Sequence, residues 1–396
     1  MNVDQRITAL VDQLTGLDDR WRGALHAVPR HLFIPDRAWC DSEGPGHLID
    51  RETDPDAWLD AVYSNTAIVT QLDDGATDIA EGKGDYTSSS SAPSAVAATL
   101  GLLKPYEGDE VLEIGTGTGW TAALLSHRLG DDNVTSIEID RSVHATAAAN
   151  LATAGRSPHL ILGDGSAGHP EGAPYDQIHV TCGIDQVPYA WIPQTRPGGR
   201  IVFPWTPRWE EAGHLTVLTP TGTGTATGRF HGRAGFMPLR SQRWPLPRLN
   251  TDYRSSSTTL DPRRVLRTSY GADIAIAAQL PHVYATHADQ ENGAFHLSLW
   301  SDDSDAQVHY SPRHKRVAVL QRGPHDLWDE VEDAYLRWVS WGTPTKDHFG
   351  MTVTPEGRHI WLHHPANPIT PPPQCTSYFS NTHLGNKSTT ESKRSS

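Results

Sequence analysis

The sequence is poor in cysteine, in basic residues and in long apolar runs. Its three cysteines, Cys40, Cys182 and Cys375, are odd in number and far apart, which argues against a disulfide framework or a zinc site and favours the reducing cytoplasm. No apolar run approaches the ~20 residues of a membrane span, and the N-terminus lacks the apolar core of a signal peptide. The net charge of −14 argues against nucleic acid and anionic membranes as partners.

What the sequence does contain is a glycine-rich turn at residues 111–119 (VLEIGTGTG). A short apolar run, expected to be a strand, ends at the glycines, and residues 120–128 then have helical character. Gly115 and Gly117 allow the backbone to turn sharply and to approach a ligand closely. The following helix directs its free N–H groups and the positive end of its dipole at the same place. Open α/β sheets bind nucleotides at such a turn.

The next two expected strands supply acidic residues. Residues 133–139 place Glu138 a little over 20 residues after Gly115, where a carboxylate can accept both hydroxyls of a ribose. Residues 160–162 run into Gly163-Asp164-Gly165, which suits the edge of an adenine. The loop lacks the Gly-Lys-Ser/Thr of a P-loop and the G-x-G-x-x-G spacing of dinucleotide sites. An adenosine cofactor without a diphosphate fits better, and S-adenosylmethionine is the candidate.

Several stretches together resemble the protein L-isoaspartate O-methyltransferase family. They are residues 28–35 (VPRHLFIP), 111–119, 163–165, 170–176 (PEGAPYD), 180–181 and 197–204, and they cover roughly the first 240 residues. The resemblance implies a class I, Rossmann-like methyltransferase fold, an α/β sheet with helices on both faces. It also implies a set of cofactor-binding residues: Glu113, Gly115, Thr116, Gly117, Thr118, Gly119, Glu138, Ile139, Gly163, Asp164, Gly165 and Thr181.

A serine run lies at residues 82–94 (GKGDYTSSSSAPS). Such runs are usually flexible linkers. Here the run aligns with a family segment that covers the cofactor and touches the substrate carboxylate, with Ser91 at the family serine and Ser90 in place of a hydrophobic residue. The resemblance therefore implies a catalytic set made of Thr87, Ser88, Ser89, Ser90 and Ser91. The same hydroxyls precede a helix expected at 95–103, whose free N–H groups they could cap and whose end favours an anion.

The strand and helix patterns divide the chain. Alternation from 107 to 204 predicts a parallel sheet, with a hairpin at 215–231 on its edge. Beyond residue 245 a tryptophan-rich stretch predicts a helix at 326–341 and hairpins at 295–310 and 351–362. His348, His363 and His364 lack carboxylate and cysteine partners, so no metal site is predicted. The expected domains are a helical, substrate-side extension (1–80), the cofactor-binding methyltransferase domain (81–244), a smaller α+β accessory domain (245–372) and a disordered tail (373–396).

A second resemblance concerns the substrate. Residues 349–357 (FGMTVTPEG) and 360–362 are similar to isoaspartyl-methyltransferase homologues encoded beside ribosomally made peptides, the partners of graspetide ligases and lanthipeptide synthetases. That likeness implies methylation of an aspartate in a cyclised peptide, which leads to an aspartimide (succinimide) or to isoaspartate, with residues 245–372 recognising the precursor. The alternative is repair of isoaspartate in damaged proteins. A cofactor-binding module without turnover also stays open, although the intact glycine loop, Glu138 and Ser91 disfavour it. So does a small-molecule methyltransferase, which would leave the specific motif match unexplained.

The expected chemistry needs little from the protein beyond placement. A carboxylate with a reference pKa of about 4 is already ionised at neutral pH, so no general base is required. The protein must align the carboxylate with the donor and exclude water. Uncharged hydroxyls at residues 87–91 can hold the anion without a permanent charge that would quench its reactivity.

Overall fold

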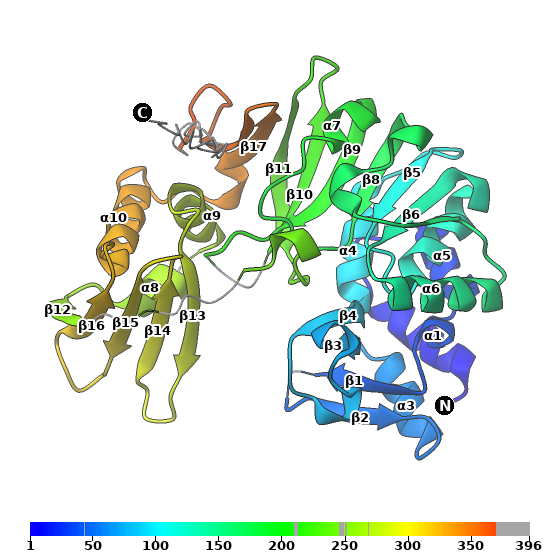
Figure 1. Cartoon of the computed structure of the whole chain (residues 1–396), viewed down its shortest axis with the longest axis horizontal. Helices are drawn as coiled ribbons and strands as arrows, with labels where there is room; N and C mark the ends of the chain where they lie inside the picture. Colours follow the sequence, from blue (N-terminus) through cyan, green and yellow to red (C-terminus); the bar gives the residue numbers. More distant parts are fainter. Residues whose placement is uncertain (43, 210–212, 245–248, 250–251, 268, 370–396) are drawn as a thin grey trace, which may run out of the picture.

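The computed structural model describes residues 1–369 apart from 43, 210–212, 245–248, 250–251 and 268, so the tail expected at 373–396 lies outside the described residues. Within this part the strands form three sheets of four, nine and five strands. Figure 1 shows the four-stranded and the five-stranded sheets below opposite ends of the nine-stranded one. No helix in these described ranges is long and apolar enough to cross a membrane.

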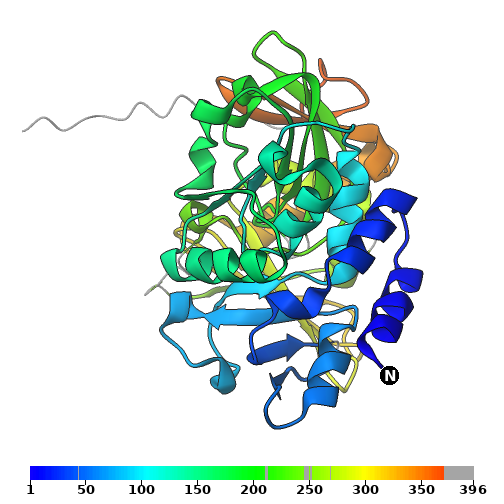
Figure 2. The ribbon, with the colours of Figure 1, turned by 90° about the vertical axis from the view of Figure 1, so that its right-hand side faces the viewer.

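The N-terminal region is helical only at first. Its first residues form two helices, α1 (Val3–Gln13) and α2 (Asp19–Ala27), separated by a turn in which Gly16 has a φ of 79°. They lie next to each other in Figure 2. The antiparallel four-stranded sheet, of order β2-β1-β3-β4, follows. Its elements are η1 (Arg30–Phe33), β1 (Arg37–Asp41), β2 (His47–Asp50), α3 (Pro55–Val62), β3 (Ala67–Leu72), η2 (Asp73–Gly75), η3 (Ile79–Glu81) and β4 (Tyr86–Ser90).

Two expectations change in this region. The extension contains a sheet as well as helices, and that sheet reaches Ser90, so a boundary at residue 80 would cut it. The serine run is the edge strand β4, paired with β3, because its hydroxyl side chains tolerate an extended backbone and find partners across the strand.

The nine-stranded sheet has the order β18-β17-β11-β10-β9-β8-β5-β6-β7. Its parallel half, which confirms the predicted fold, consists of β5 (Val111–Ile114), β6 (Val134–Glu138), β7 (His159–Leu162), β8 (Tyr175–Val180) and β9 (Thr195–Trp205). The antiparallel half consists of β10 (His214–Pro220), β11 (Ala226–Arg233), β17 (Phe349–Thr354) and β18 (Gly357–Leu362). Connecting helices are α4 (Pro93–Leu103), α5 (Trp120–Leu129), η4 (Asp131–Asn133), α6 (Arg141–Thr153), η5 (Gly165–Ala167), η6 (Pro170–Gly172) and α7 (Trp191–Gln194).

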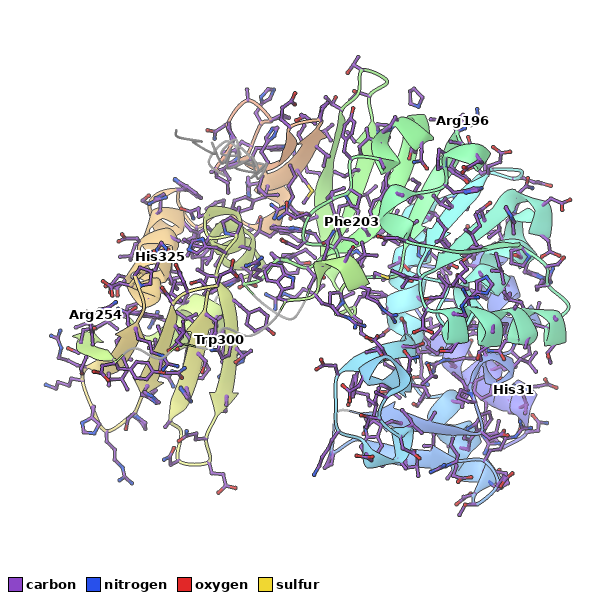
Figure 3. All side chains as sticks on the ribbon, viewed as in Figure 1. His31, Arg196, Phe203, Arg254, Trp300 and His325 are labelled. Atoms are coloured by element: carbon purple, nitrogen blue, oxygen red, sulfur yellow. The ribbon has the colours of Figure 1, made fainter. Side chains whose placement is uncertain are left out.

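Helices cover both faces of this sheet, and successive strand residues alternate between the faces. Val111 and Val202 pack with α4, α5 and the N-terminal helices. Leu112 and Phe203 face the other side, where α7 packs and where the core continues into the C-terminal region. Figure 3 shows Phe203 on the central sheet, between the two smaller sheets. The chain runs from β5 outward to β7 and returns to β8 on the other side of β5, which creates a switch point at the carboxyl ends of β5 and β8.

The C-terminal region is an antiparallel five-stranded sheet of order β12-β16-β15-β14-β13 with helices on one side. Its elements are η7 (Arg240–Gln242), β12 (Arg254–Thr258), α8 (Pro262–Arg267), α9 (Tyr270–Gln279), β13 (Tyr284–Asp289), β14 (Phe295–Trp300), β15 (Asp305–Tyr310), β16 (Val317–Arg322), α10 (Leu327–Ser340) and η8 (Lys346–His348). The helix predicted at 326–341 and the hairpin at 295–310 are confirmed.

The second C-terminal hairpin lies elsewhere than expected. Residues 351–362 do form two strands, but β17 pairs with β11, so this hairpin is the edge of the central sheet and not part of the five-stranded one. Alternating apolar side chains predict a strand without saying which sheet edge it joins. Residues 349–362 therefore belong to the central sheet, and one apolar cluster of buried residues spans this sheet and the five-stranded one.

Candidate active site

A cavity of about 570 Å³ lies at the switch point of the central sheet. The ends of β5, β6 and β8 form one wall, β4 forms a second, and residues 235–243 close a third. Of the residues predicted from the sequence, those that line it are Thr87, Ser88, Ser89, Ser90, Ser91, Gly115, Thr116, Gly117, Thr118, Glu138, Ile139, Asp164, Gly165 and Thr181. Glu113, Gly119 and Gly163 do not line it.

The glycine loop adopts the conformation that its composition predicts. Gly115, Gly117 and Gly119 have φ values of 92°, 54° and 91°, which other residues adopt only with strain. A Cβ on Gly115 would lie 2.6 Å from Thr181 Oγ1, so glycine is also required by space. Gly119 begins α5 and lies against α6 instead of the cavity.

Glu113 is fully buried beneath the loop. Its Oε2 accepts a hydrogen bond of 2.6 Å from Ser136, whose hydroxyl is in turn 2.6 Å from that of Thr116. This chain of bonds anchors Thr116 and with it the loop. We therefore assign Glu113 a supporting position and not contact with a ligand.

Glu138 lies at the end of β6 with both carboxylate oxygens turned toward backbone amides. Oε2 accepts from the N–H of Gly117 at 2.9 Å and Oε1 from that of Asp140 at 3.0 Å. A carboxylate offers about four lone-pair positions, so both oxygens can accept further bonds from a ligand in the cavity. Ile139 follows with 39% of its surface exposed, which leaves an apolar side chain available beside the carboxylate.

Residues that directly follow β7 and β8 complete this wall of the cavity. Asp164 Oδ1 accepts from the N–H of Ser166 and caps η5, while the carboxylate lines the cavity. Gly165 leaves no room for a side chain, because a Cβ would lie 2.5 Å from Ile114 Cγ2. Thr181 donates to the carbonyl of Ile114 at 3.1 Å and joins β8 to the glycine loop. Gly163 only continues the strand, donating to the carbonyl of Glu138.

The serine hydroxyls at the end of β4 and just after it fall into two groups. Ser88 accepts from Thr70 at 3.0 Å and Ser90 accepts from Arg30 at 3.2 Å, and both serines are buried. Ser89 and Ser91 line the cavity, and within the described ranges their hydroxyls have no hydrogen-bond partner. These two hydroxyls are therefore available to an anion.

The predicted capping of the next helix by this cluster is wrong. Helix α4 begins at Pro93 after Ala92 and has no side-chain cap from a serine. Asn65 instead accepts from the N–H of Ser94 at 2.9 Å. The serines cannot reach because the strand that contains them ends at Ser90, and Asn65 reaches the helix only through the fold of the four-stranded sheet.

Residues 235–243 were not predicted to take part. Arg243 donates to both carboxylate oxygens of Asp74, at 2.8 and 3.0 Å, and Arg240 contacts Asp74 at 3.0 Å and Asp140 at 3.2 Å. Asp74 itself has a left-handed backbone with a φ of 54°. The four side chains, here termed the clasp, join this wall to the four-stranded sheet. No local sequence signal marks the clasp, because Asp74 and Arg243 are 169 positions apart.

Cys182 also lines the cavity, directly behind Gly115. Burial raises the pKa of its thiol to about 12. The thiol is therefore protonated at neutral pH, which excludes a thiolate nucleophile. The polar groups that line the cavity include hydroxyls, carboxylates and the two arginines of the clasp, a set suited to binding and aligning ligands.

Comparison with known proteins agrees with this geometry. Residues 49–243 match the family described as "Protein-L-isoaspartate(D-aspartate) O-methyltransferase (PCMT)". A protein-L-isoaspartate O-methyltransferase of Pyrococcus abyssi is 43% identical over 152 residues, which are 38% of this chain and 68% of that protein. This chain belongs to the protein-L-isoaspartate O-methyltransferase family. It is a carboxyl O-methyltransferase, and its cofactor is S-adenosylmethionine.

More distant family members cover more of the chain. Protein-L-isoaspartate O-methyltransferase 2 of Archaeoglobus fulgidus is 31% identical over 250 residues, 61% of this chain and 96% of that protein. A solved protein-L-isoaspartate O-methyltransferase superposes with a TM-score of 0.52 and 21% identity, over 91% of this chain and 100% of the other. That likeness concerns the fold alone, and its extent reaches past residue 243.

The clasp leads to a prediction about cofactor exchange. Asp74→Asn removes the charge that Arg240 and Arg243 share, and because the side chains are partly exposed we expect a loss of about 1 kcal/mol, roughly fivefold faster dissociation of S-adenosylhomocysteine. Stopped-flow displacement measures this rate. Asp36→Asn, at an exposed pair with Arg51, is the control and should leave it unchanged. Equal rates for both variants would show that the clasp does not limit exchange.

Through the same clasp, the rate of cofactor dissociation should depend on ionic strength but not on pH near neutrality. Hydrogen bonds from Arg243 hold the pKa of Asp74 below its usual value. A carboxylate with a lowered folded pKa contributes fully above its unfolded value of about 3.9, and the contribution is lost only as the pH falls through the folded value. We expect the dissociation rate to be flat from pH 6 to 8 and to rise with ionic strength.

Proposed function

We propose that this enzyme methylates the carboxylate of an isoaspartyl residue in a peptide or protein. The observation that carries the proposal is a pair of hydroxyls without a partner among the described residues, Ser89 in β4 and Ser91 just after it, which line the cavity opposite the glycine loop. A Cβ on Gly117 would be only 3.5 Å from the carbonyl of Ser89, so the two walls approach closely. Family relatives over the same residues are named for this activity.

The residues present fit the cofactor. We propose that Glu138 accepts the ribose hydroxyls, that Ile139 and Asp164 hold the adenine, and that the backbone of Gly115–Gly117 lies along the amino-acid end. The left-handed glycines, the apolar exposed Ile139 and the spare lone pairs of Glu138 support this assignment. When bound, S-adenosylmethionine supplies a methyl group activated by its positively charged sulfur.

The protein itself must position the acceptor carboxylate and keep water away from it. Ser89 and Ser91 donate hydrogen bonds to the acceptor carboxylate and hold one oxygen toward the glycine loop. No proton has to move, because the carboxylate is already ionised. Residues 235–243 and the clasp cover one side of the cavity, and the less water reaches the anion, the more reactive it is. In the methyl ester product, attack by the next backbone nitrogen forms a succinimide and releases methanol.

A second candidate is an aspartate in a cyclised, ribosomally synthesised peptide, with an aspartimide as the product. The five-stranded sheet favours it, because a repair enzyme acting on exposed isoaspartate has no evident need of such a module. The module alone does not decide the matter, since the solved family member also extends past residue 243. The first candidate therefore has the better support.

Methyl incorporation from labelled S-adenosylmethionine separates the two. We would compare a linear isoaspartyl peptide, the same peptide with aspartate, and a side-chain-cyclised aspartyl peptide. Incorporation into the isoaspartyl peptide alone supports the first proposal, and incorporation into the cyclised peptide alone, followed by methanol release, supports the second. The variant Glu138→Ala serves as the blank. Labelling of the linear aspartyl peptide as well as the isoaspartyl one would contradict both.

A further inference from the structure

Arg30 is a buried cation that the proposed chemistry does not use. It lies in η1, within the Val28–Pro35 stretch of the sequence, and only 1% of its surface is exposed. Its neighbour His31 marks this part of the molecule in Figure 3. Burial lowers the pKa of Arg30 to about 9, so the guanidinium remains charged at neutral pH.

One edge of the guanidinium contacts the end of β4. Nε donates to Ser90 Oγ at 3.2 Å, and Nη2 donates to the carbonyls of Ser90 and Ser91 at 3.0 Å each. These bonds hold the backbone at the point where the strand ends and the chain turns toward α4. They lie directly behind Ser89 and Ser91, whose hydroxyls face the cavity.

The rest of the group contacts two other parts of the fold. The carbonyls of Val62, Ser64 and Thr66 accept from it at 2.8, 3.3 and 2.9 Å. The guanidinium also lies 5.3 Å from the ring centre of Trp120. Trp120 is the first residue of α5, follows the glycine loop and lines the cavity. Arg30 thus joins the serine strand to the helix that begins at the glycine loop.

No carboxylate pairs with Arg30 in the described part of the chain, which is unusual for a charge so deeply buried. A lysine offers a point charge and three donors, and cannot reproduce a planar fork that serves six acceptors on two segments. If the group only stabilised the fold, a neutral capping residue would avoid the cost of desolvating a charge. Its place behind the unpartnered hydroxyls indicates a role in the reaction.

We propose that Arg30 is a positioning residue that fixes the Ser89–Ser91 backbone relative to the glycine loop and so aligns the acceptor carboxylate. This inference rests on the proposed use of Ser89 and Ser91 as the carboxylate donors. A misplacement of about 1 Å can lower turnover 100-fold. The effect should fall on kcat, because alignment matters most in the transition state, and not on cofactor affinity.

The test is the variant Arg30→Lys, which keeps the charge and loses the fork. S-adenosylhomocysteine titration by calorimetry counts intact sites, and turnover of the linear isoaspartyl peptide is then expressed per site. We expect kcat per site to fall roughly 10- to 100-fold, with the dissociation constant of S-adenosylhomocysteine changed less than about threefold. The matched control is Arg22→Lys, since Arg22 also donates to two carbonyls, those of Val11 and Leu14, away from the cavity. It should change neither quantity.

An unchanged kcat per site in Arg30→Lys, or a parallel loss of cofactor binding, would overturn the proposal, because either marks a purely structural role. If Arg30→Lys does not fold, Ser90→Ala decides, since it removes one acceptor of the fork and leaves the carbonyl contacts. A several-fold lower kcat supports the proposal and an unchanged one contradicts it. Failure of the proposed function is distinct, because the unmodified enzyme would then not methylate the isoaspartyl peptide at all.

Discussion

Glu138→Ala is expected to weaken S-adenosylhomocysteine binding by at least about 100-fold. Two effects add. The side chain loses the bonds that we propose it makes to the ribose, and the amides of Gly117 and Asp140 lose their acceptor in a largely buried place. Hydrogen bonds to a charged group contribute about 1.5–3 kcal/mol each, so two of them exceed the ~2.7 kcal/mol that corresponds to 100-fold.

Isothermal titration calorimetry measures the change, with the thermal unfolding midpoint of the unliganded variant as a check on the fold. Glu138→Gln is the matched comparison, because its single amide oxygen can satisfy one of the two amides and carries no charge. Its affinity should lie between those of the other two proteins. A Glu138→Ala protein that binds as well as the parent would remove this residue from the site.

Arg358→Met is expected to destabilise the fold by about 3–5 kcal/mol. Arg358 on β18 pairs with Asp185 at 3.0 Å, and the two side chains are only 5% and 7% exposed. Removing the arginine leaves a buried carboxylate without its partner. The segment that contains Asp185 is also bonded to the cavity wall at residues 235–243, because Gln242 accepts from the amides of Asp185 and Gln186. We therefore expect cofactor affinity to fall several-fold as well.

Urea unfolding monitored by tryptophan fluorescence gives the free energy. Arg254→Met is the control, since its pair with Asp326 is about half exposed and should contribute less than 1 kcal/mol. Figure 3 shows Arg254 far from Phe203 and the central sheet. The double variant Asp185→Leu/Arg358→Met removes both charges and should recover part of the loss. Equal stability of Arg358→Met and Arg254→Met would show that the buried pair is not a structural link.

Features that depend on neighbouring residues could be predicted from the sequence. The turn at Gly115–Gly119 requires left-handed backbone, and only glycine adopts it cheaply, so the pattern identifies the loop. The spacing to Glu138 follows from one strand–helix–strand unit. The alternation of strand and helix patterns likewise predicted the parallel sheet, and strand patterns around turns predicted the hairpins. In each case the deciding interactions span a few residues or one βαβ crossover.

Features that depend on contacts between residues far apart in the sequence could not be predicted. The serine run resembles a linker until β3 is seen beside it, and its hydroxyls could cap α4 until Asn65 is seen to do so. The family resemblance places Glu113 among the cofactor-binding residues. In the structure its side chain lies beneath the glycine loop, where it accepts a hydrogen bond from Ser136. The clasp joins residues that no local pattern connects. Such contacts come from tertiary packing, which a single sequence does not specify by spacing.

The return of the chain to the central sheet through β17 and β18 has a consequence for how the five-stranded sheet is attached. The chain leaves the central sheet after β11 and returns beside that same strand as β17. The five-stranded sheet is therefore attached at two neighbouring points and not through a single linker. Two attachment points and an apolar core shared with the central sheet restrict the movement of the five-stranded sheet. Cutting the chain after residue 244 would therefore remove β17 and β18 and leave β11 as an unpaired edge strand. Excising the five-stranded sheet alone would keep all nine strands of the central sheet.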